Sequence, residues 1–238
     1  NLNKLFMKTV AILFICCGPL FCLGQLDNDR MFSHSFKEKI IRSYAINSKD
    51  ISELLVGLKG QLGDGKVYFS SDNGLNWEEL NQGKALCDSC EDIQALSFFK
   101  NVYLAGTWKN GLYISEDNGN TFSKVEGFPS QDIRAIKVSN DGKTVYAATT
   151  TSGILSSENG KEWNCLHADS LARTLASWSL ECDPFDKNTV YAMTFGNGIY
   201  QSTDGSKNWS ALTSKKDVMI WDMVVDESYF YAIGSDDS

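Results

Sequence analysis

The segment Ser70-Ser71-Asp72-Asn73-Gly74-Leu75-Asn76-Trp77 decides the fold, because variants of it recur three times further along the chain. The later copies run from Ser115 to Phe122, from Ser156 to Trp163 and from Ser202 to Trp209. Their closing aromatic residues follow one another at intervals of 45, 41 and 46 residues. Such regular spacing indicates one structural unit that is repeated along the chain.

Each repeat contains four short stretches with the pattern of β-strands. In the third repeat they are residues 133–138, 144–149, 153–156 and 163–166, which are rich in β-branched and aromatic residues. Asn140-Asp141-Gly142 is a typical hairpin turn between the first two. A period in the forties with four strands per unit is what a propeller blade requires. We therefore predict an all-β fold, a β-propeller of four-stranded antiparallel blades.

The repeated segment also carries a family resemblance. Its pattern, Ser-x-Asp-x-Gly-x-(Thr/Asn)-Trp, resembles the Asp-box, or BNR repeat, over nearly all of residues 40–238. Families with this repeat include sialidases, xyloglucan-cleaving glycoside hydrolases, sortilin-type receptors and the photosystem II stability and assembly factors. Because these families share the turn and differ in activity, the resemblance implies a fold and leaves the function open.

The Asp-box is expected to be structural, in the turn between the third and fourth strands of each blade. There the carboxylate accepts bonds from backbone N–H groups, the glycine supplies a positive φ, and the aromatic ring packs between blades. Glu158 replaces the Asp in the third copy and Ser206 takes the Gly position in the fourth, so we expect those turns to be less rigid. The residues assigned this role are Ser70, Asp72, Gly74, Trp77, Ser115, Asp117, Gly119, Phe122, Ser156, Glu158, Gly160, Trp163, Ser202, Asp204 and Trp209.

The number of first strands gives the number of blades. They begin near Ile41, Ile93, Ile133, Ser177 and Ile220, which amounts to about four and a half blades over residues 41–238, after a lead-in at 25–40. Blades close into a ring to protect their strand edges, and the resembling families use six, seven or more. We therefore expect a propeller that is incomplete at its C-terminal end, a fragment of such a larger ring.

Residues 1–24 are interpreted as upstream residues followed by a signal peptide. Met7-Lys8 precedes an apolar run from Val10 to Ile15 that is too short to span a bilayer, and we place cleavage after Gly24. We expect the mature protein to be secreted, extracellular or at the cell surface or, in a bacterium, periplasmic. The alternatives are a buried N-terminal strand or helix, and a lipoprotein attached through Cys16, Cys17 or Cys22.

Charge excludes some partners. The chain has a net charge of −8, and removal of Lys4 and Lys8 with the signal peptide makes it more acidic. A protein without a basic stripe is repelled by phosphate backbones, so nucleic acid is not an expected partner. The remaining sequence has no run long enough for a membrane span.

Four cysteines remain after cleavage, and in an exported chain an even number suggests disulfides. We expect a small loop closed by Cys87–Cys90, with Cys165–Cys182 as a second option. Cys87 and Cys90 have the spacing of a redox or zinc pair, but His34 and His167 are the only histidines and neither stands at ligand spacing. No metal and no cofactor are expected.

A ligand is expected on the face opposite the Asp-boxes, where the first strands begin and the second-to-third-strand loops emerge. Aromatic, guanidinium and amide groups together suit a sugar ring or a peptide segment. The alternative is that the tryptophans pack between blades and the arginines face water. The candidates are Arg42, Gln94, Arg134, Trp178 and Trp221 at one repeated strand position, with Trp108 and Phe195 from the loops.

Two functions remain open. The first is a non-catalytic scaffold for a protein or polysaccharide ligand. The second is a glycoside hydrolase, either xyloglucanase-like, with paired carboxylates, or sialidase-like, with three arginines that grip a carboxylate. Asp222 is the best single acid for the former, without an identified partner, and Arg42 and Arg134 supply two of the three arginines for the latter. Missing blades would hold the remaining catalytic residues.

Overall fold

A computed structural model gives the fold of the chain and describes residues 36, 39–60, 65–87, 92–165, 174–213, 218–225 and 229–236. The predicted signal peptide and Cys90 lie outside these residues. The described elements are antiparallel strands and one 3₁₀ turn, η1 (Asn81–Gly83), so the all-β prediction is confirmed. In this part of the chain no helix has the length and apolar character needed to cross a membrane.

The strands form successive antiparallel sheets, each one blade. The first blade is β1 (Ile40–Ile46), β2 (Leu54–Lys59), β3 (Val67–Ser70) and β4 (Glu78–Glu79). The second is β5 (Ile93–Phe99), β6 (Val102–Thr107), β7 (Leu112–Ser115) and β8 (Ser123–Lys124). The third is β9 (Ile133–Val138), β10 (Val145–Thr149) and β11 (Ile154–Ser157), and the fourth is β12 (Ser177–Cys182), β13 (Val190–Thr194), β14 (Ile199–Ser202) and β15 (Ser210–Ala211). The fifth sheet is the pair β16 (Val218–Val225) and β17 (Phe230–Asp236).

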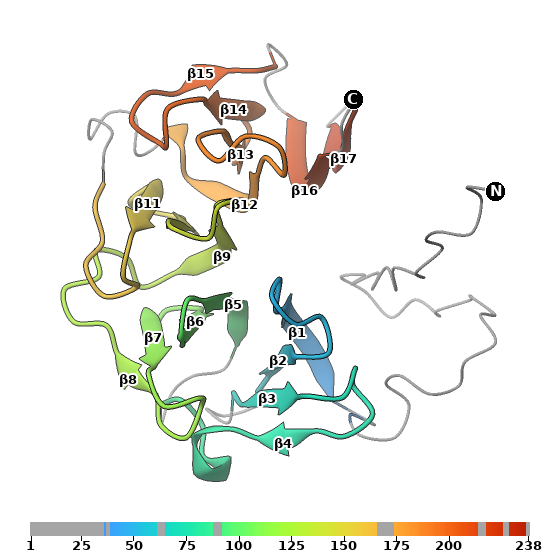
Figure 1. Ribbon diagram of the computed structural model, residues 1–238. Coiled ribbons are helices and arrows are strands. Elements are labelled where there is room, and N and C mark those ends of the chain that lie inside the picture. The colour runs from blue at the N-terminus through green and yellow to red at the C-terminus, as the bar shows by residue number, and fades with distance from the viewer. Residues whose placement is uncertain are drawn as a thin grey trace, which may run out of the picture.

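The blades are arranged as a partial propeller. Their first strands contact one another in the order β1, β5, β9, β12, β16 around a common axis (Figure 1). The later strands of each blade lie progressively further from that axis, so the sheets radiate outward (Figure 1). These first strands begin where the repeat predicted them, because alternation of apolar residues marked their buried faces.

The hydrophobic core is divided among the contacts between blades. Ile93 of the second blade lies against Gly57 of the first, where an added Cβ would come within 2.6 Å of it, and Ile133 meets Gly106 in the same way. These two glycines therefore let neighbouring sheets approach closely. Phe122, Trp163 and Trp209 each pack into the core shared with the preceding blade.

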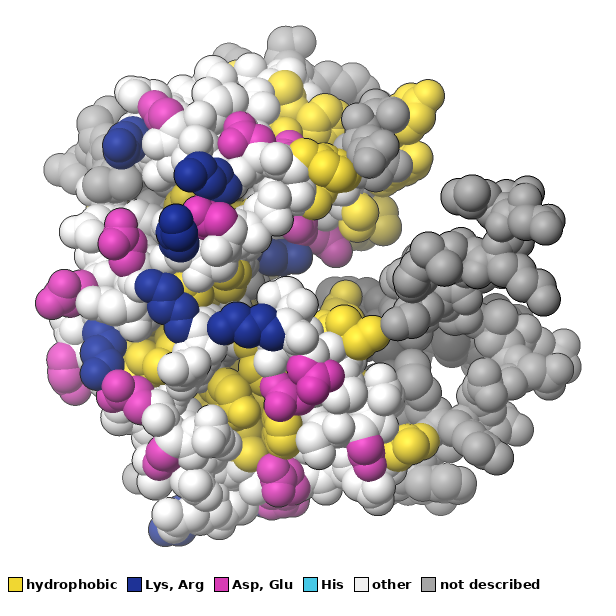
Figure 2. Space-filling model, viewed as in Figure 1, with side chains coloured by type: hydrophobic (Ala, Val, Ile, Leu, Met, Phe, Trp, Pro, Cys, Tyr) yellow, Lys and Arg dark blue, Asp and Glu magenta, His cyan; other side chains and the backbone are white. Residues whose placement is uncertain are grey.

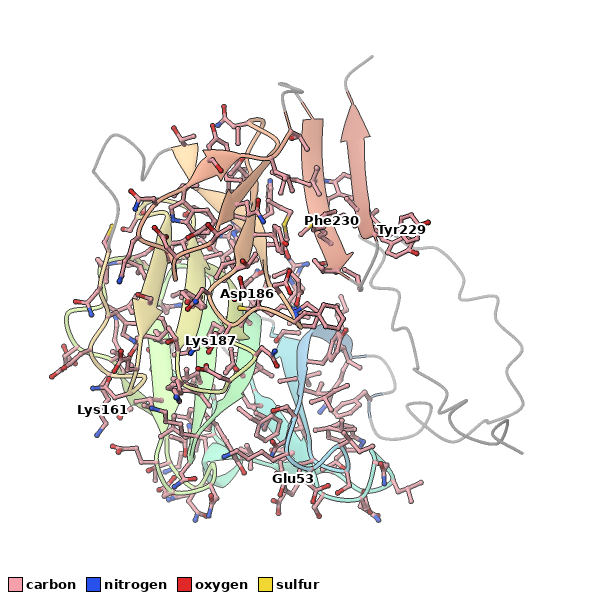
Figure 3. All side chains as sticks on the ribbon, turned by 45° about the horizontal axis from the view of Figure 1, so that its top comes forward. Glu53, Lys161, Asp186, Lys187, Tyr229 and Phe230 are labelled. Atoms are coloured by element: carbon pink, nitrogen blue, oxygen red, sulfur yellow. The ribbon has the colours of Figure 1, made fainter. Side chains whose placement is uncertain are left out.

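Trp77 is the exception among the closing aromatics, because the described residues include no sheet before its own. Its ring lies 5.2 Å from that of Phe36, edge to face, in a small cluster with Val56, Leu58 and Tyr68. A residue from before the first strand thus covers the face that a preceding blade would cover. At the other end of the arc, Figure 2 shows apolar side chains gathered over the last blade, and Figure 3 places Tyr229 and Phe230 at the start of β17.

The repeated turns are closed by their own side chains. Ser70 Oγ donates to Asp72 Oδ1 at 2.8 Å and accepts from the Gly74 N–H at 2.9 Å. Asp72 in turn accepts from the backbone and the side chain of Asn76, at 2.9 and 2.6 Å. The second and fourth turns repeat these bonds through Asp117 and Asp204.

The third turn corrects the sequence prediction. Ser157 and Asn159 occupy the positions assigned to Ser156 and Glu158, because Ser157 Oγ accepts from the Gly160 N–H at 2.8 Å and Asn159 Oδ1 accepts from the Glu162 N–H at 2.9 Å. The consecutive serines allow this slip of one residue, and an amide oxygen replaces the carboxylate as acceptor. Ser156 instead pairs with Asn164 in an isolated bridge, where the other complete blades have a fourth strand.

The cysteines agree with the sequence prediction only in part. Cys87 is disulfide-bonded. Cys182 is a free, buried thiol in the core between the third and fourth blades, so the optional Cys165–Cys182 disulfide is absent. Cys165 is exposed, and its Sγ donates to Ser152 O at 3.9 Å. The two sulfurs thus lie in different environments, a relationship that sequence spacing does not reveal.

Candidate functional site

A β-bulge opens the first strand of every sheet. The register between first and second strands shifts once in each sheet, and the residue passed over is always the one at the predicted repeated position. A bulge turns the extra side chain out of the normal alternation of a strand. The five residues carried by these bulges are Arg42, Gln94, Arg134, Trp178 and Trp221.

Four of the predicted residues form a stack that crosses three blades. The Arg134 guanidinium carbon lies 5.5 Å from the ring centroid of Trp108 and 4.7 Å from that of Trp178. Trp178 also lies 4.3 Å from Phe195, and Lys109 Nζ lies 5.0 Å above Trp108. We call Lys109, Trp108, Arg134, Trp178 and Phe195 the cation–π ladder. Its two tryptophans stack at the face of the propeller rather than in the cores between blades.

Backbone bonds hold the loops of the ladder in place. Trp108, Thr150 and Phe195 are the first loop residues after the second strands of three successive blades, and each donates its N–H to the segment that leads into its own first strand. The acceptors are the carbonyl oxygens of Asp92, Asp132 and Ala176, at 3.1, 3.4 and 3.0 Å. The loop side chains therefore lie next to the bulges.

Two acids behind the bulges orient the polar side chains. Arg134 Nη2 donates to Asp132 Oδ2 at 2.9 Å, and Gln94 Nε2 donates to Asp92 Oδ2 at 3.2 Å. Arg42 Nε lies 3.6 Å from the same Asp92 oxygen, an ion pair too long for a hydrogen bond. Sequence reasoning missed both acids. Their position two residues before Gln94 and Arg134 was the available signal.

Buried polar atoms without partners are concentrated here. Six such side-chain atoms occur among the described residues: Arg42 Nε, Asp92 Oδ1, Asp132 Oδ1, Arg134 Nε, Trp178 Nε1 and Ser206 Oγ. Only the last belongs to a turn, and the other five belong to the bulge residues and the two acids behind them. Leaving such a group unsatisfied costs about 1–3 kcal/mol, so this concentration makes the bulge residues and their two acids a candidate site.

A cavity of about 550 Å³ lies between the first strands and begins at Arg42, Gln94 and Arg134. Of the described residues that line it, Asp222 is the only acid, and its Oδ1 accepts from Ser179 Oγ at 3.2 Å. Lys137 also lines it and pairs with Glu181 at 2.7 Å. Although burial disfavours the charge on Lys137, the attraction of Glu181 and its hydrogen bond raise the lysine pKa.

The remaining predicted residue, Trp221, lies apart from the ladder. It is 53% exposed and makes no ring contact among the described residues. The structure thus brings Trp108, Arg134, Trp178 and Phe195 together, and it places Arg42 and Gln94 on Asp92. We call the surface formed by Arg42, Gln94, Trp108, Arg134, Trp178 and Phe195 the bulge face.

A second cavity, of about 570 Å³, lies on the turn side between the third and fourth blades. Its lining mixes lysines such as Lys187 and Lys207 with acids such as Glu158 and Glu162. The carboxylate of Asp204, which lines this cavity, already accepts hydrogen bonds from Ser202 and Asn208 of its own turn. The bulge face, whose polar atoms include several without partners, is therefore the stronger candidate site.

Comparison with known proteins shows the fold. No protein-family model and no curated protein matches the sequence. Among solved structures, an ancestral GH74 enzyme superposes with a TM-score of 0.66 at 21% identity, over 84% of this chain and 28% of its own. YCF48 bound to a D1 peptide gives 0.57 at 14% identity, over 87% of this chain and 78% of its own. A computationally designed protein, Ika8, gives 0.56 at 15% identity, over 78% and 53%.

These likenesses support a β-propeller and carry no further assignment, because their identities are low. The chain spans 28% of the length of the ancestral GH74 enzyme.

Proposed function

We propose that this chain is an Asp-box β-propeller that acts as a non-catalytic scaffold and binds a protein or polysaccharide ligand at the bulge face. The observation that carries the proposal is the repeated bulge, which turns one side chain from each sheet toward the same face. Repeated presentation of this kind builds a binding surface from a rigid frame.

The opposite, turn-bearing face has a structural role in this proposal. The carboxylates of Asp72, Asp117 and Asp204 are engaged by hydroxyl, amide and backbone donors of their own turns. Backbone and side-chain bonds from Asn208 lower the pKa of Asp204 to about 2. Acids held in this way are poor proton donors, and they stabilise the turn instead.

A glycoside hydrolase is the second candidate function, favoured by the exposed carboxylate of Asp222 in the central cavity. Hydrolysis by this route needs a second acid across the substrate. No other described residue that lines the cavity supplies one.

The experiment that separates the two functions is a panel of xyloglucan, other β-glucans, sialosides and a peptide library, assayed for both binding and turnover. Binding without turnover, reduced by Trp178→Ala, supports the scaffold. Turnover that disappears in Asp222→Asn would replace it with the hydrolase. Leu75→Ala, at a residue that is 59% exposed on a turn, is the matched control.

We also propose that further blades complete the arc into a ring of six, seven or more. The outer face of the last sheet exposes Val224, Tyr231 and Ile233 at 61%, 56% and 58%, an extent of apolar surface that a neighbouring blade would cover. A longer product that includes the following blades should bind less of the apolar dye ANS per molecule than this chain. Equal dye binding would contradict the proposal.

Export through the N-terminal signal is the final part of the proposed function. It rests on the sequence pattern before Gln25. Mass spectrometry of the exported protein should find Gln25 at its N-terminus, whereas a retained residue 1–24 segment would contradict cleavage.

A further inference from the structure

We infer that the ligand of the bulge face is an acidic peptide segment whose carboxylates lie against the guanidinium groups of Arg42 and Arg134. This inference rests on the proposed binding function and names the chemistry of its ligand. Three observations carry it: the occupied ring faces of the ladder, the unused donors of the two arginines, and their shared cavity.

The rings of the ladder already stack on other groups of the chain. Trp108 has Lys109 above its ring, and both tryptophans have Arg134 against theirs. Trp178 also lies against Phe195. Stacking of a pyranose on either indole would first require displacement of these groups. The tryptophans therefore act as positioning residues for Arg134, and they favour a peptide over a polysaccharide.

The two arginines retain donors for a ligand. Among the described residues, Arg134 donates one hydrogen bond, from Nη2 to Asp132, and Arg42 donates none. The Nε atoms of both arginines are buried, so the terminal Nη groups supply the N–H donors that a carboxylate of the ligand would meet. Because Arg134 is held between two rings and its side chain is only 11% exposed, little conformational freedom is lost when it binds.

The shared cavity allows one ligand to contact both arginines. Arg42 and Arg134 both line the cavity of about 550 Å³, and Gln94 lines it between them, from the intervening blade. The Gln94 Nε2 is bonded to Asp92, which leaves its side-chain oxygen to accept from a peptide N–H. A segment that lies across Gln94 therefore meets a guanidinium on each side and an amide acceptor in the middle.

Isothermal titration calorimetry with two peptides tests this chemistry. The probes are the hexapeptide Gly-Glu-Gly-Glu-Gly-Glu and its counterpart with glutamine in place of glutamate, both blocked at their ends. The wild-type chain should bind the glutamate peptide at least about tenfold more tightly, the effect of one lost charge-assisted contact. This comparison needs no variant and so does not depend on how a variant folds.

Variants then assign the contact. Arg42→Gln and Arg134→Gln should each weaken binding of the glutamate peptide by about tenfold or more, and each should reduce the difference in affinity between the two peptides. Arg134→Lys should rescue binding in part, since it keeps the charge and loses the fork. Lys161→Gln is the control, at an exposed lysine on the turn of the third blade that pairs with Glu116 (Figure 3). It should change neither the affinity for the glutamate peptide nor the difference in affinity between the two peptides.

The outcomes separate this inference from the proposed function. Equal affinity for the two peptides, or no effect of either arginine variant, would overturn acid recognition and leave a binding scaffold. Binding of polygalacturonate through the same arginines, without binding of the glutamate peptide, would overturn the peptide in favour of an acidic polysaccharide. Failure to bind either peptide or any polysaccharide of the panel would overturn both proposals.

Discussion

Arg134 and Trp178 stack 4.7 Å apart, guanidinium carbon to ring centroid, although they belong to different blades. Each occupies the bulge of its own first strand, so the contact depends on two backbone irregularities that face each other. Trp108 closes the other side of the guanidinium from a third blade. The cation–π ladder is therefore a joint product of three blades.

The first prediction concerns this stack. Trp178→Ala should weaken ligand binding by about tenfold or more because Arg134 loses one of the rings that orient it, whereas the free energy of unfolding should fall by only about 1 kcal/mol. Titration calorimetry and urea unfolding measure the two effects. A large loss of stability with unchanged binding would instead place Trp178 in the structural core.

The turn carboxylates predict a dependence of stability on pH. Hydrogen bonds lower the pKa of Asp72, Asp117 and Asp204 in the folded chain, the last to about 2. Their contribution is therefore complete above the unfolded pKa of about 3.9 and is lost as the pH falls through the lower folded pKa. Thermal unfolding between pH 5 and pH 2 should show a declining Tm.

Asp72→Ala provides the matched test of that dependence. It should lower the Tm at pH 5 and flatten the decline toward pH 2, whereas Asp72→Asn should retain part of the Tm because an amide oxygen still accepts, as Asn159 does in the third turn. Calcium-dependent recovery of the Tm in the wild type would contradict a purely structural role.

Two tryptophans of different environment give a prediction about packing. Trp163→Ala should destabilise the chain by about 3 kcal/mol because its ring packs with Phe128 into the core between two blades. Trp221→Ala should change the free energy of unfolding by less than about 0.5 kcal/mol because that side chain is 53% exposed. Urea denaturation compares the two, and equal losses would contradict the assignment of blade interfaces.

The thiol of Cys182 should be unreactive in the folded chain. Burial raises its pKa, so the reactive thiolate is scarce at neutral pH. A thiol reagent should label Cys182 only under conditions that unfold the protein, as peptide mapping would show. Rapid labelling at pH 7 without unfolding would indicate an open contact between the third and fourth blades.

Sequence predicted the blades well because their signals are local. The repeated turn, the alternating strands and the first-strand positions each lie within a few residues of one another, and the bulge residues emerged from simple alignment of the repeats. The slip of the third turn escaped prediction because Ser156 and Ser157 offer the same hydroxyl, and Asn159 competes with Glu158 as acceptor.

The contacts of the site were less predictable because they join blades. Nothing in the spacing of Trp108, Arg134 and Trp178 shows that the arginine lies between the two rings. Asp92 and Asp132 stand before only two of the five bulges, so alignment of the repeats did not single them out. Their importance appears only once the guanidinium and amide groups that they orient are placed.

The six tryptophans of the chain allow the central claim to be tested within one molecule. Trp108 and Trp178 lie on the bulge face, and Trp221 occupies the bulge of the last sheet, apart from the ladder. The other three, Trp77, Trp163 and Trp209, lie on the turns. The measurement is the shift of the six indole N–H signals in a nitrogen-15 NMR titration with the tightest-binding member of the panel. Shifts of Trp108 and Trp178 with unchanged Trp77, Trp163 and Trp209 are the predicted result. Shifts confined to the turn tryptophans would place the ligand on the opposite face and contradict the account.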